Sequence, residues 1–143
     1  MAYAKETGIG QDIVVTQADI RAIQLAKAAI YVGAEYLMNK YGIGHVDEVI
    51  LAGAFGSYIN KRSALVMGMF PDCALEHIHA VGNAAGDGAR IALLNIDKRH
   101  EADEIARKVE FVETAAEPDF QEHFMEAIAI PHAKAKFPHV PEQ

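Results

Sequence analysis

Two short apolar segments, each followed directly by glycine, constrain the fold of this chain more than any other feature. The first covers 47–53 (DEVILAG), and the second covers about 78–81 and is followed by Gly82 and Asn83. The first segment is too apolar to have a solvated face, which is typical of a strand covered by helices. Helical patterns precede, separate and follow the two segments. This alternation predicts an α/β fold, with helices flanking a short sheet.

The longest helical pattern spans about 17–41. Thr16 is placed to cap this helix, and Asp19, three residues later, completes a capping box. Apolar residues recur at steps of three and four along the pattern and form one stripe. They are Ile20, Ile23, Ala26, Ile30, Ala34 and Leu37. We expect this stripe to pack on the sheet.

The rest of the chain predicts shorter elements and two peripheral segments. We expect a turn at 53–56, helices at about 61–70, 84–95, 97–108 and 118–128, and a further strand at 110–114. Residues 1–15 contain two glycines and a short β-branched run, so they are expected to be an incoming strand or connector. Three prolines and weak periodicity in 131–143 predict a surface or flexible tail.

The composition argues against several classes of function. Thirteen Lys and Arg against 20 Asp and Glu give a net charge of −7, which would repel nucleic acid. No segment has the roughly 20 apolar residues of a membrane span, and the first residues lack the apolar run of a signal peptide. The single cysteine, Cys73, provides neither an internal disulfide nor a four-thiolate cluster. We therefore expect a single cytoplasmic domain that binds neither nucleic acid nor membrane.

The two glycine segments are the candidate binding site. Ligands of open α/β sheets gather at the carboxyl ends of strands, where glycine lets the backbone approach them. The first segment supplies Gly53, Ala54, Phe55 and Gly56, and the second supplies Gly82, Asn83, Gly86 and Gly88. Neither segment matches a phosphate-binding Walker loop or a dinucleotide fingerprint in register. The residues alone leave open whether they bind a nucleotide or only permit tight turns and close packing.

Other chemistry-bearing residues give weaker patterns. Cys73, His77 and His79 match no known metal spacing and lack a fourth ligand, so we assign no metal site. Phe55 and Tyr58 could stack on a base or pack in the core. No side chains form a recognisable nucleophile or acid/base arrangement, so we assign no catalytic residue.

Three separated blocks resemble one protein family. They are VDEVILAGAFGSYINKRSALVMGMFPD, VGNAAGDGARIALLN and AAEPDFQEHFMEAIAIPH. Together they resemble the end of the ATP-dependent reductive activators of corrinoid proteins, over nearly the whole stretch from Asp12 to His132. That family is similar to the acetate and sugar kinase, heat-shock chaperone and actin superfamily.

The resemblance implies an actin-like, ribonuclease-H-like lobe with a short mixed sheet flanked by helices, with 16–130 as a portion of the second lobe. Gly53, Ala54, Phe55 and Gly56 match the superfamily's adenosine motif, although many members have two adjacent glycines where this chain has Gly53 and Ala54. The segment from Gly82 to Gly86 resembles the second connecting helix at the hinge between lobes, and Gly88 extends this corner.

The resemblance also implies cofactors and partners. The expected ligand is ATP with magnesium, at a site left incomplete because the first-lobe phosphate loop and its acids have no match here. The iron-sulfur cluster is expected only in the missing part of the parent protein. The parent would return cobalt(II) corrinoid proteins to cobalt(I) for methyl transfer, and its partners would be the corrinoid protein and the remainder of the activator chain.

A fragment, natural or engineered, is the simplest explanation of the missing motifs, and the isolated chain would then be inactive. Two other interpretations of function stay open at this point. The chain could instead be a non-catalytic module that docks a corrinoid protein or forms a homodimer. An activator of the 2-hydroxyacyl-CoA dehydratase type is the rival among enzymes, although such activators usually present cluster cysteines.

Overall fold

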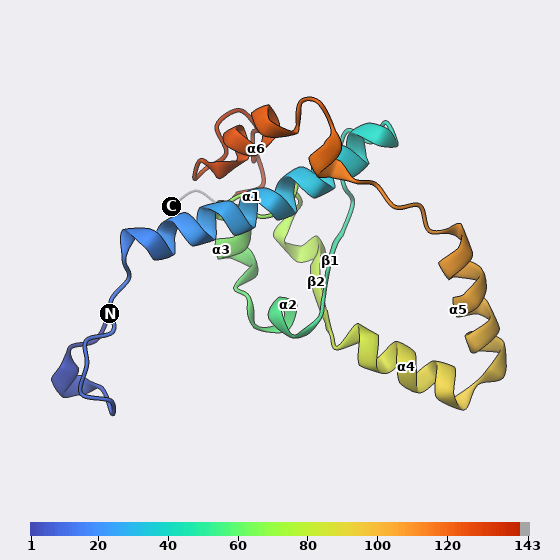
Figure 1. Cartoon of the computed structure of the whole chain (residues 1–143), viewed down its shortest axis with the longest axis horizontal. Helices are drawn as coiled ribbons and strands as arrows, with labels where there is room; N and C mark the ends of the chain where they lie inside the picture. Colours follow the sequence, from blue (N-terminus) through green and yellow to red (C-terminus); the bar gives the residue numbers. More distant parts are fainter. Residues whose placement is uncertain (141–143) are drawn as a thin grey trace.

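The computed structural model describes residues 1–140, which form a mixed α/β arrangement (Figure 1). The helices are η1 (Ala4–Glu6), α1 (Gln17–Lys40), α2 (Ala54–Tyr58), α3 (Lys61–Val66), η2 (Leu75–His77), α4 (Ala84–Leu94), α5 (Ile96–Lys108), η3 (Thr114–Ala116) and α6 (Phe120–Ile128). The strands are β1 (Val49–Ala52) and β2 (Ile78–Gly82). The predicted α/β class, with helices flanking a short sheet, is confirmed.

The long helix α1 begins where the sequence predicts. The hydroxyl of Thr16 accepts a hydrogen bond from the Asp19 amide at 3.2 Å, and the Asp19 carboxylate accepts from the Thr16 amide at 2.7 Å. These two bonds complete the capping box and satisfy two donors at the helix start. The hydroxyl and the amide of Thr16 both donate to the Asp19 carboxylate, and these bonds lower the pKa of the Asp19 carboxyl group. α1 is the longest helix, and α6 packs along one side of it (Figure 1).

The sheet consists of β1 and β2, which pair in parallel within the described residues. Val49 lies opposite Ile78, and Leu51 lies opposite Ala80. A bulge then shifts the register, so that Ala52 lies opposite Gly82. The predicted mixed sheet is therefore a parallel pair here, and the two glycine segments follow the same edge of it.

Four expectations were wrong. The apolar stripe of α1 does not pack on the sheet, because α1 packs mainly against α6, and Ile20, Ile23, Ile30 and Leu37 are 44–48% exposed. Residues 53–56 do not form a simple turn, because helix α2 begins at Ala54, directly after Gly53. The helix predicted to reach residue 70 ends at Val66, because Gly68 adopts a left-handed conformation with φ of 68°. Residues 110–114 form no strand, because no other strand of the described chain lies beside them to share backbone hydrogen bonds.

Two hydrophobic clusters make up the core of residues 1–140. The first gathers residues of α3, the loop after it and β2; its buried members are Ala64, Leu65, Met69, Phe70, Cys73 and Ile78. The second lies between α1 and α6, and its buried members are Ala28, Tyr31, Val32 and Ala127. Phe137 packs against both clusters. The segment expected to be a surface or flexible tail thus contributes to the core, and its last residues, 141–143, lie outside the described part.

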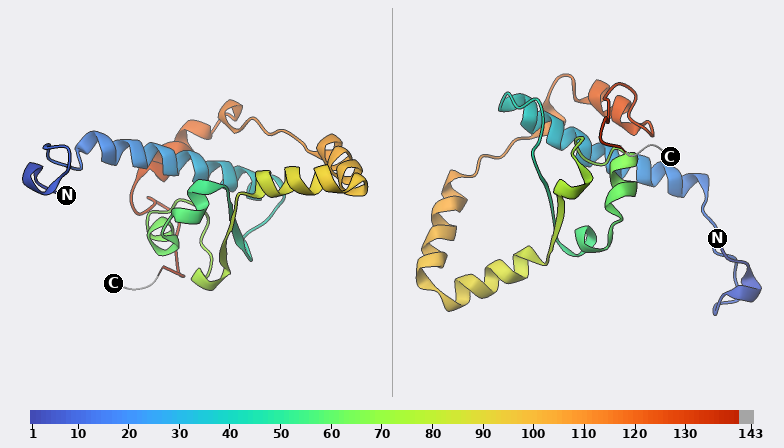
Figure 2. Two further views of the ribbon diagram at one scale, coloured as in Figure 1. Left: turned by 90° about the horizontal axis from the view of Figure 1, so that it is seen from below. Right: turned by 180° about the vertical axis from the view of Figure 1, so that it is seen from behind.

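Helices α4 and α5 project from the rest of the molecule as an arm (Figures 1 and 2). They contact each other, and neither contains a buried residue. Large apolar side chains are exposed along the arm: Ile91, Leu93, Leu94, Ile96 and Ile105. The chain exposes 10354 Å² in total, whereas a compact protein of this mass exposes about 7,200 Å².

The amino-terminal segment lies beyond the start of α1, away from both clusters (Figure 1). It folds on itself through one antiparallel bridge between Ala2 and Ile13, and η1 lies between the bridged residues. No helix within residues 1–140 is both long and apolar enough to cross a membrane.

Candidate functional site

The first glycine corner lies where β1 passes into α2. Gly53 has φ of 97°, a backbone conformation that side-chain-bearing residues rarely adopt. A Cβ atom built on Gly53 would meet no atom within 4 Å. The backbone conformation therefore requires glycine at position 53, and the space that a side chain would occupy there is open.

Gly56, on the first turn of α2, has a different role. A Cβ atom there would come within 2.8 Å of the Leu51 Cβ and 3.0 Å of the Leu51 carbonyl carbon. The absence of a side chain at Gly56 thus lets α2 lie directly against β1. The hydroxyl of Ser57 donates to the Gly53 carbonyl oxygen at 3.2 Å and steadies the same turn.

The two corners meet. The amide of Gly53 donates a hydrogen bond to the carbonyl oxygen of Gly82 at 2.7 Å. Gly82 also adopts a left-handed conformation, with φ of 69°. Because this bond joins the ends of β1 and β2, the two glycine segments that we singled out form one continuous backbone surface.

The second corner continues into α4 through a side-chain cap. The Asn83 side-chain oxygen accepts a hydrogen bond from the Gly86 amide at 3.1 Å. A Cβ atom on Gly86 would lie 2.4 Å from the Asn83 side-chain nitrogen, so this cap requires glycine there. A Cβ atom on Gly88 would meet nothing within 4 Å. Gly86 therefore shapes the cap, whereas Gly88 leaves one face of α4 open.

Aromatic side chains beside the first corner are exposed. Phe55 is 68% exposed and Tyr58 is 90% exposed, so neither packs in a core of the described residues. The core interpretation of these two residues is therefore wrong. Ala54 precedes them at the start of α2 and is also exposed. The corner offers glycine backbone, apolar side chains and open space, and no acid/base pair.

Comparison with known proteins decides the family. A family described as the C-terminal domain of RACo, the ASKHA domain, matches residues 1–141. The chain belongs to this family. The corrinoid activation enzyme RamQ from Eubacterium limosum is 40% identical over 124 residues, which are 85% of this chain and 21% of RamQ.

A solved structure gives the same result for this member of the RACo C-terminal family. A protein described as a reductive activator for corrinoid, iron-sulfur protein matches with a TM-score of 0.84 and 38% identity, over 93% of this chain and 22% of that chain. The resemblance to reductive activators is thereby confirmed. The chain spans about a fifth of the length of these two relatives.

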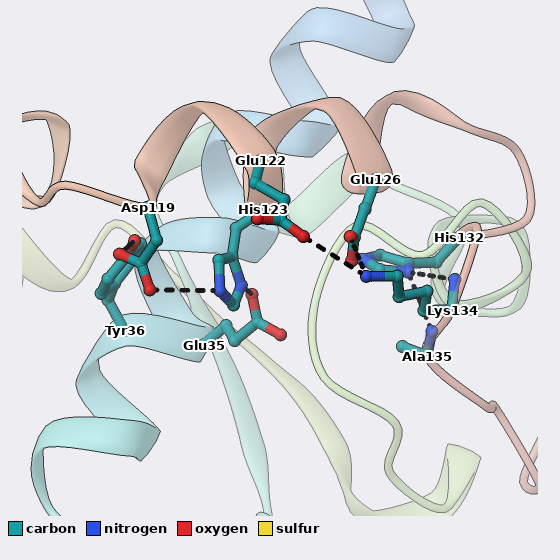
Figure 3. Close-up of polar contacts among 9 residues, drawn as sticks. All are labelled: Glu35, Tyr36, Asp119, Glu122, His123, Glu126, His132, Lys134 and Ala135. Carbon is teal, nitrogen blue, oxygen red and sulfur yellow. Dashed lines mark hydrogen bonds and ion pairs between the residues drawn. The ribbon is translucent and has the colours of Figure 1, made fainter.

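A polar cluster that the sequence did not reveal joins α1 to α6 (Figure 3). The Glu35 carboxylate lies 2.8 Å from His123 Nδ1, and the Asp119 carboxylate lies 3.5 Å from His123 Nε2. The hydrogen bond with Glu35 is the main reason that the pKa of His123 is raised. Tyr36 donates to Asp119 and lowers the pKa of that carboxyl group.

The same close-up shows a second group of polar contacts at the end of α6. Lys134 forms an ion pair with Glu126, and His132 Nδ1 accepts backbone hydrogen bonds (Figure 3). No signal in the sequence marked either group, because their members are up to 88 positions apart. Across residues 1–140, no set of three or more His, Cys, Asp and Glu side chains is arranged to hold a metal ion.

Proposed function

We propose that this chain is the nucleotide-binding portion of an ATP-dependent reductive activator, which returns cobalt(II) corrinoid proteins to cobalt(I). The family and the names of the two relatives support the role in corrinoid activation. The hydrogen bond from Gly53 to Gly82 carries the assignment of the site, because it unites the two corners at the end of the parallel sheet.

Gly53, Ala54, Phe55 and Gly56 would hold the adenosine end of ATP. The left-handed Gly53 and the open space before it are consistent with close approach of a ligand to the backbone. Gly82, Asn83, Gly86 and Gly88 would form the adjoining hinge corner. ATP with magnesium would supply a phosphate group whose binding or hydrolysis favours one arrangement of the lobes.

Residues 16–130 would be the second-lobe portion of the actin-like domain, and the rest of the activator would complete the site. The electron would come through an iron-sulfur domain outside this chain, since Cys73, the one cysteine here, is buried and cannot hold a cluster alone. The partners would be the corrinoid protein and the remainder of the activator. The isolated chain would be inactive.

A chimaera tests this proposal. The present chain replaces the matching segment of RamQ, and calorimetric titration with Mg-ATP is combined with absorption spectroscopy of a cobalt(II) corrinoid protein. Gly53→Val is compared with Gly42→Val, a matched control in which glycine is also left-handed and also faces open space. Both variants place a side chain at positive φ, and the strain is larger at Gly53, whose φ of 97° and ψ of 171° are almost exclusive to glycine, so circular dichroism first checks that each variant is folded.

We expect the chimaera to bind ATP and to reduce the corrinoid. Gly53→Val is expected to lose binding and Gly42→Val to keep it. A folded chimaera that binds no ATP, or equal binding by both variants, would contradict the proposed adenosine site.

One observation favours the docking alternative. The exposed surface exceeds that of a compact protein by roughly 3,000 Å², and the arm exposes Ile91, Leu93, Leu94, Ile96 and Ile105. A docking or homodimerisation module would bind the corrinoid protein, or a second copy, in fixed stoichiometry without nucleotide. Sedimentation of the chain with and without a corrinoid protein distinguishes this function from the first.

A further inference from the structure

The segment 131–140, which we call the C-terminal strap, connects the two hydrophobic clusters. The ring of Phe137 lies 6.1 Å from the Tyr31 ring in the α1–α6 cluster. A Cβ atom on Gly68, in the loop after α3, would come within 3.2 Å of the same phenylalanine ring. Phe137 therefore fills the space between the two clusters.

The strap also forms one wall of a cleft. The cleft has a volume of about 750 Å³ and lies between the second half of α1, the loop 43–47 and the segment 71–77. The strap contributes Lys136, Pro138 and His139 to its lining. Release of the strap would open the cleft on that side.

The buried imidazole of His132 stabilises the turn at the start of the strap. His132 is 7% exposed, and its Nδ1 atom accepts hydrogen bonds from the Lys134 amide at 3.1 Å and the Ala135 amide at 3.0 Å (Figure 3). An imidazole nitrogen that accepts two N–H groups carries no proton, so the ring must be neutral. The other nitrogen, Nε2, is buried without a hydrogen-bond partner among residues 1–140. Protonation of Nδ1 would remove the acceptor of both backbone bonds.

The surroundings of His132 favour the neutral ring. The charged and titratable groups that face it are Lys27, Tyr31 and Glu35 on α1, His123 and Glu126 on α6, and Lys134 in the strap itself. Burial is the main cause of the lowered pKa of His132, and Lys27 and His123 act in the same direction. The carboxylates of Glu35 and Glu126 raise the pKa of His132, but by less than the other groups and burial lower it.

The sign of the pH dependence follows from this direction. Because the folded-state pKa lies below the ordinary value of 6.5, the contribution of His132 to stability is complete above that value. It is lost as the pH falls toward the folded-state pKa. Acidification therefore weakens the hold of His132 on the strap.

A second histidine contacts the body of the molecule from the strap. His139 Nδ1 lies 2.6 Å from an oxygen of Asp72, and the His139 amide donates to the other oxygen at 3.2 Å. The His139 side chain is 55% exposed, so this contact is screened by solvent and weak. A charge on the buried His132 ring would be far more costly.

We propose that residues 131–140 are a detachable strap, held closed by neutral His132, that acid releases to uncouple the two clusters and open the cleft. This inference does not depend on nucleotide binding. It rests on the two bonds to Nδ1, the burial of the ring and the position of Phe137 between the clusters.

Amide hydrogen exchange of the 143-residue chain, followed by NMR and corrected for the intrinsic pH dependence of exchange, tests the strap directly. The Lys134 and Ala135 amides are expected to lose roughly tenfold in protection between about pH 7.5 and pH 5.5. The Val32 amide, within α1, is expected to keep its protection. Unchanged protection of the two strap amides would overturn the proposal.

His132→Asn is the critical variant, because the asparagine side-chain oxygen takes the position of Nδ1 and does not titrate. Its strap amides are expected to be protected at both pH values, whereas His139→Asn is expected to keep the pH dependence of the normal chain. Equal loss of protection in His132→Asn would overturn the proposal. If that variant does not fold, the ring titration of His132 in the normal chain decides: its midpoint must coincide with the loss of protection.

Discussion

The ammonium group of Lys27 donates a hydrogen bond to the carbonyl oxygen of Ala129 at 2.5 Å, across 102 positions of the chain. The Lys27 side chain is fully buried, and burial lowers its pKa. Ala129 directly follows the last residue of α6, where unpaired carbonyl oxygens gather and positive charge is favoured. A side chain of α1 thus caps the carboxyl end of α6.

Replacing Lys27 tests this cap. Lys27→Ala removes both the buried stem and the donor, so we expect a loss of about 3 kcal/mol in the free energy of unfolding. Lys27→Met keeps the stem and removes only the donor, and we expect a loss of about 1 kcal/mol. Urea unfolding measures both values. Equal losses in the two variants would show that the hydrogen bond matters and the stem does not.

The His123–Glu35 pair predicts a pH-dependent contact between α1 and α6. Because the pKa of His123 is raised, its contribution is complete below the ordinary histidine value of about 6.5 and is lost as the pH rises through the raised value. His123→Gln is therefore expected to remove roughly 0.5–1 kcal/mol at about pH 5.5 and little at about pH 8.5. The exposed His100, on α5, provides the control substitution His100→Gln. A pH-independent difference for His123→Gln would refute the assignment.

Two glycine substitutions at the proposed nucleotide and hinge corners are expected to change the stability of the chain in opposite directions. Gly56→Ala places a methyl group 2.8 Å from the Leu51 Cβ, and we expect it to destabilise the chain by about 1–3 kcal/mol as α2 moves away from β1. Gly88→Ala meets nothing within 4 Å in α4 and is expected to stabilise that helix by about 0.5–1 kcal/mol. Thermal unfolding of the two variants compares them.

Phe137→Ala is expected to remove the connection between the two clusters. The ring is only partly buried, so its loss predicts about 2 kcal/mol of destabilisation. The clusters would then unfold at separate temperatures when followed by NMR. Phe111→Ala is the matched control, because Phe111 is 83% exposed and its removal is expected to change stability by less than about 0.5 kcal/mol. A single shared transition in Phe137→Ala would show that other contacts unite the clusters.

Local patterns were sufficient to predict most of the elements. Thr16 and Asp19 fixed the start of α1, and Gly53 and Gly82, each at the end of an apolar run, correctly marked the ends of β1 and β2. These predictions succeeded because caps, strand ends and left-handed glycines depend on residues within a few positions of one another.

Predictions that needed distant partners failed or were not made. Residues 110–114 have the composition of a strand, but a strand needs a neighbour, and in the described chain Glu110 instead pairs with Lys40 at 2.5 Å. Lys27 lies at the edge of the α1 stripe, and only the carbonyl of Ala129 explains why it is buried. Sequence periodicity carries no information about acceptors that lie 70 to 102 positions away.

The large exposed surface of this chain has a calorimetric consequence. The heat-capacity increase on unfolding scales with the surface that becomes newly exposed, at about 12–15 cal/mol/K per residue for compact domains. A chain that already exposes 10354 Å² has less left to expose. Its melting peak is therefore expected to be low and broad, and to sharpen only when another protein surface covers the arm.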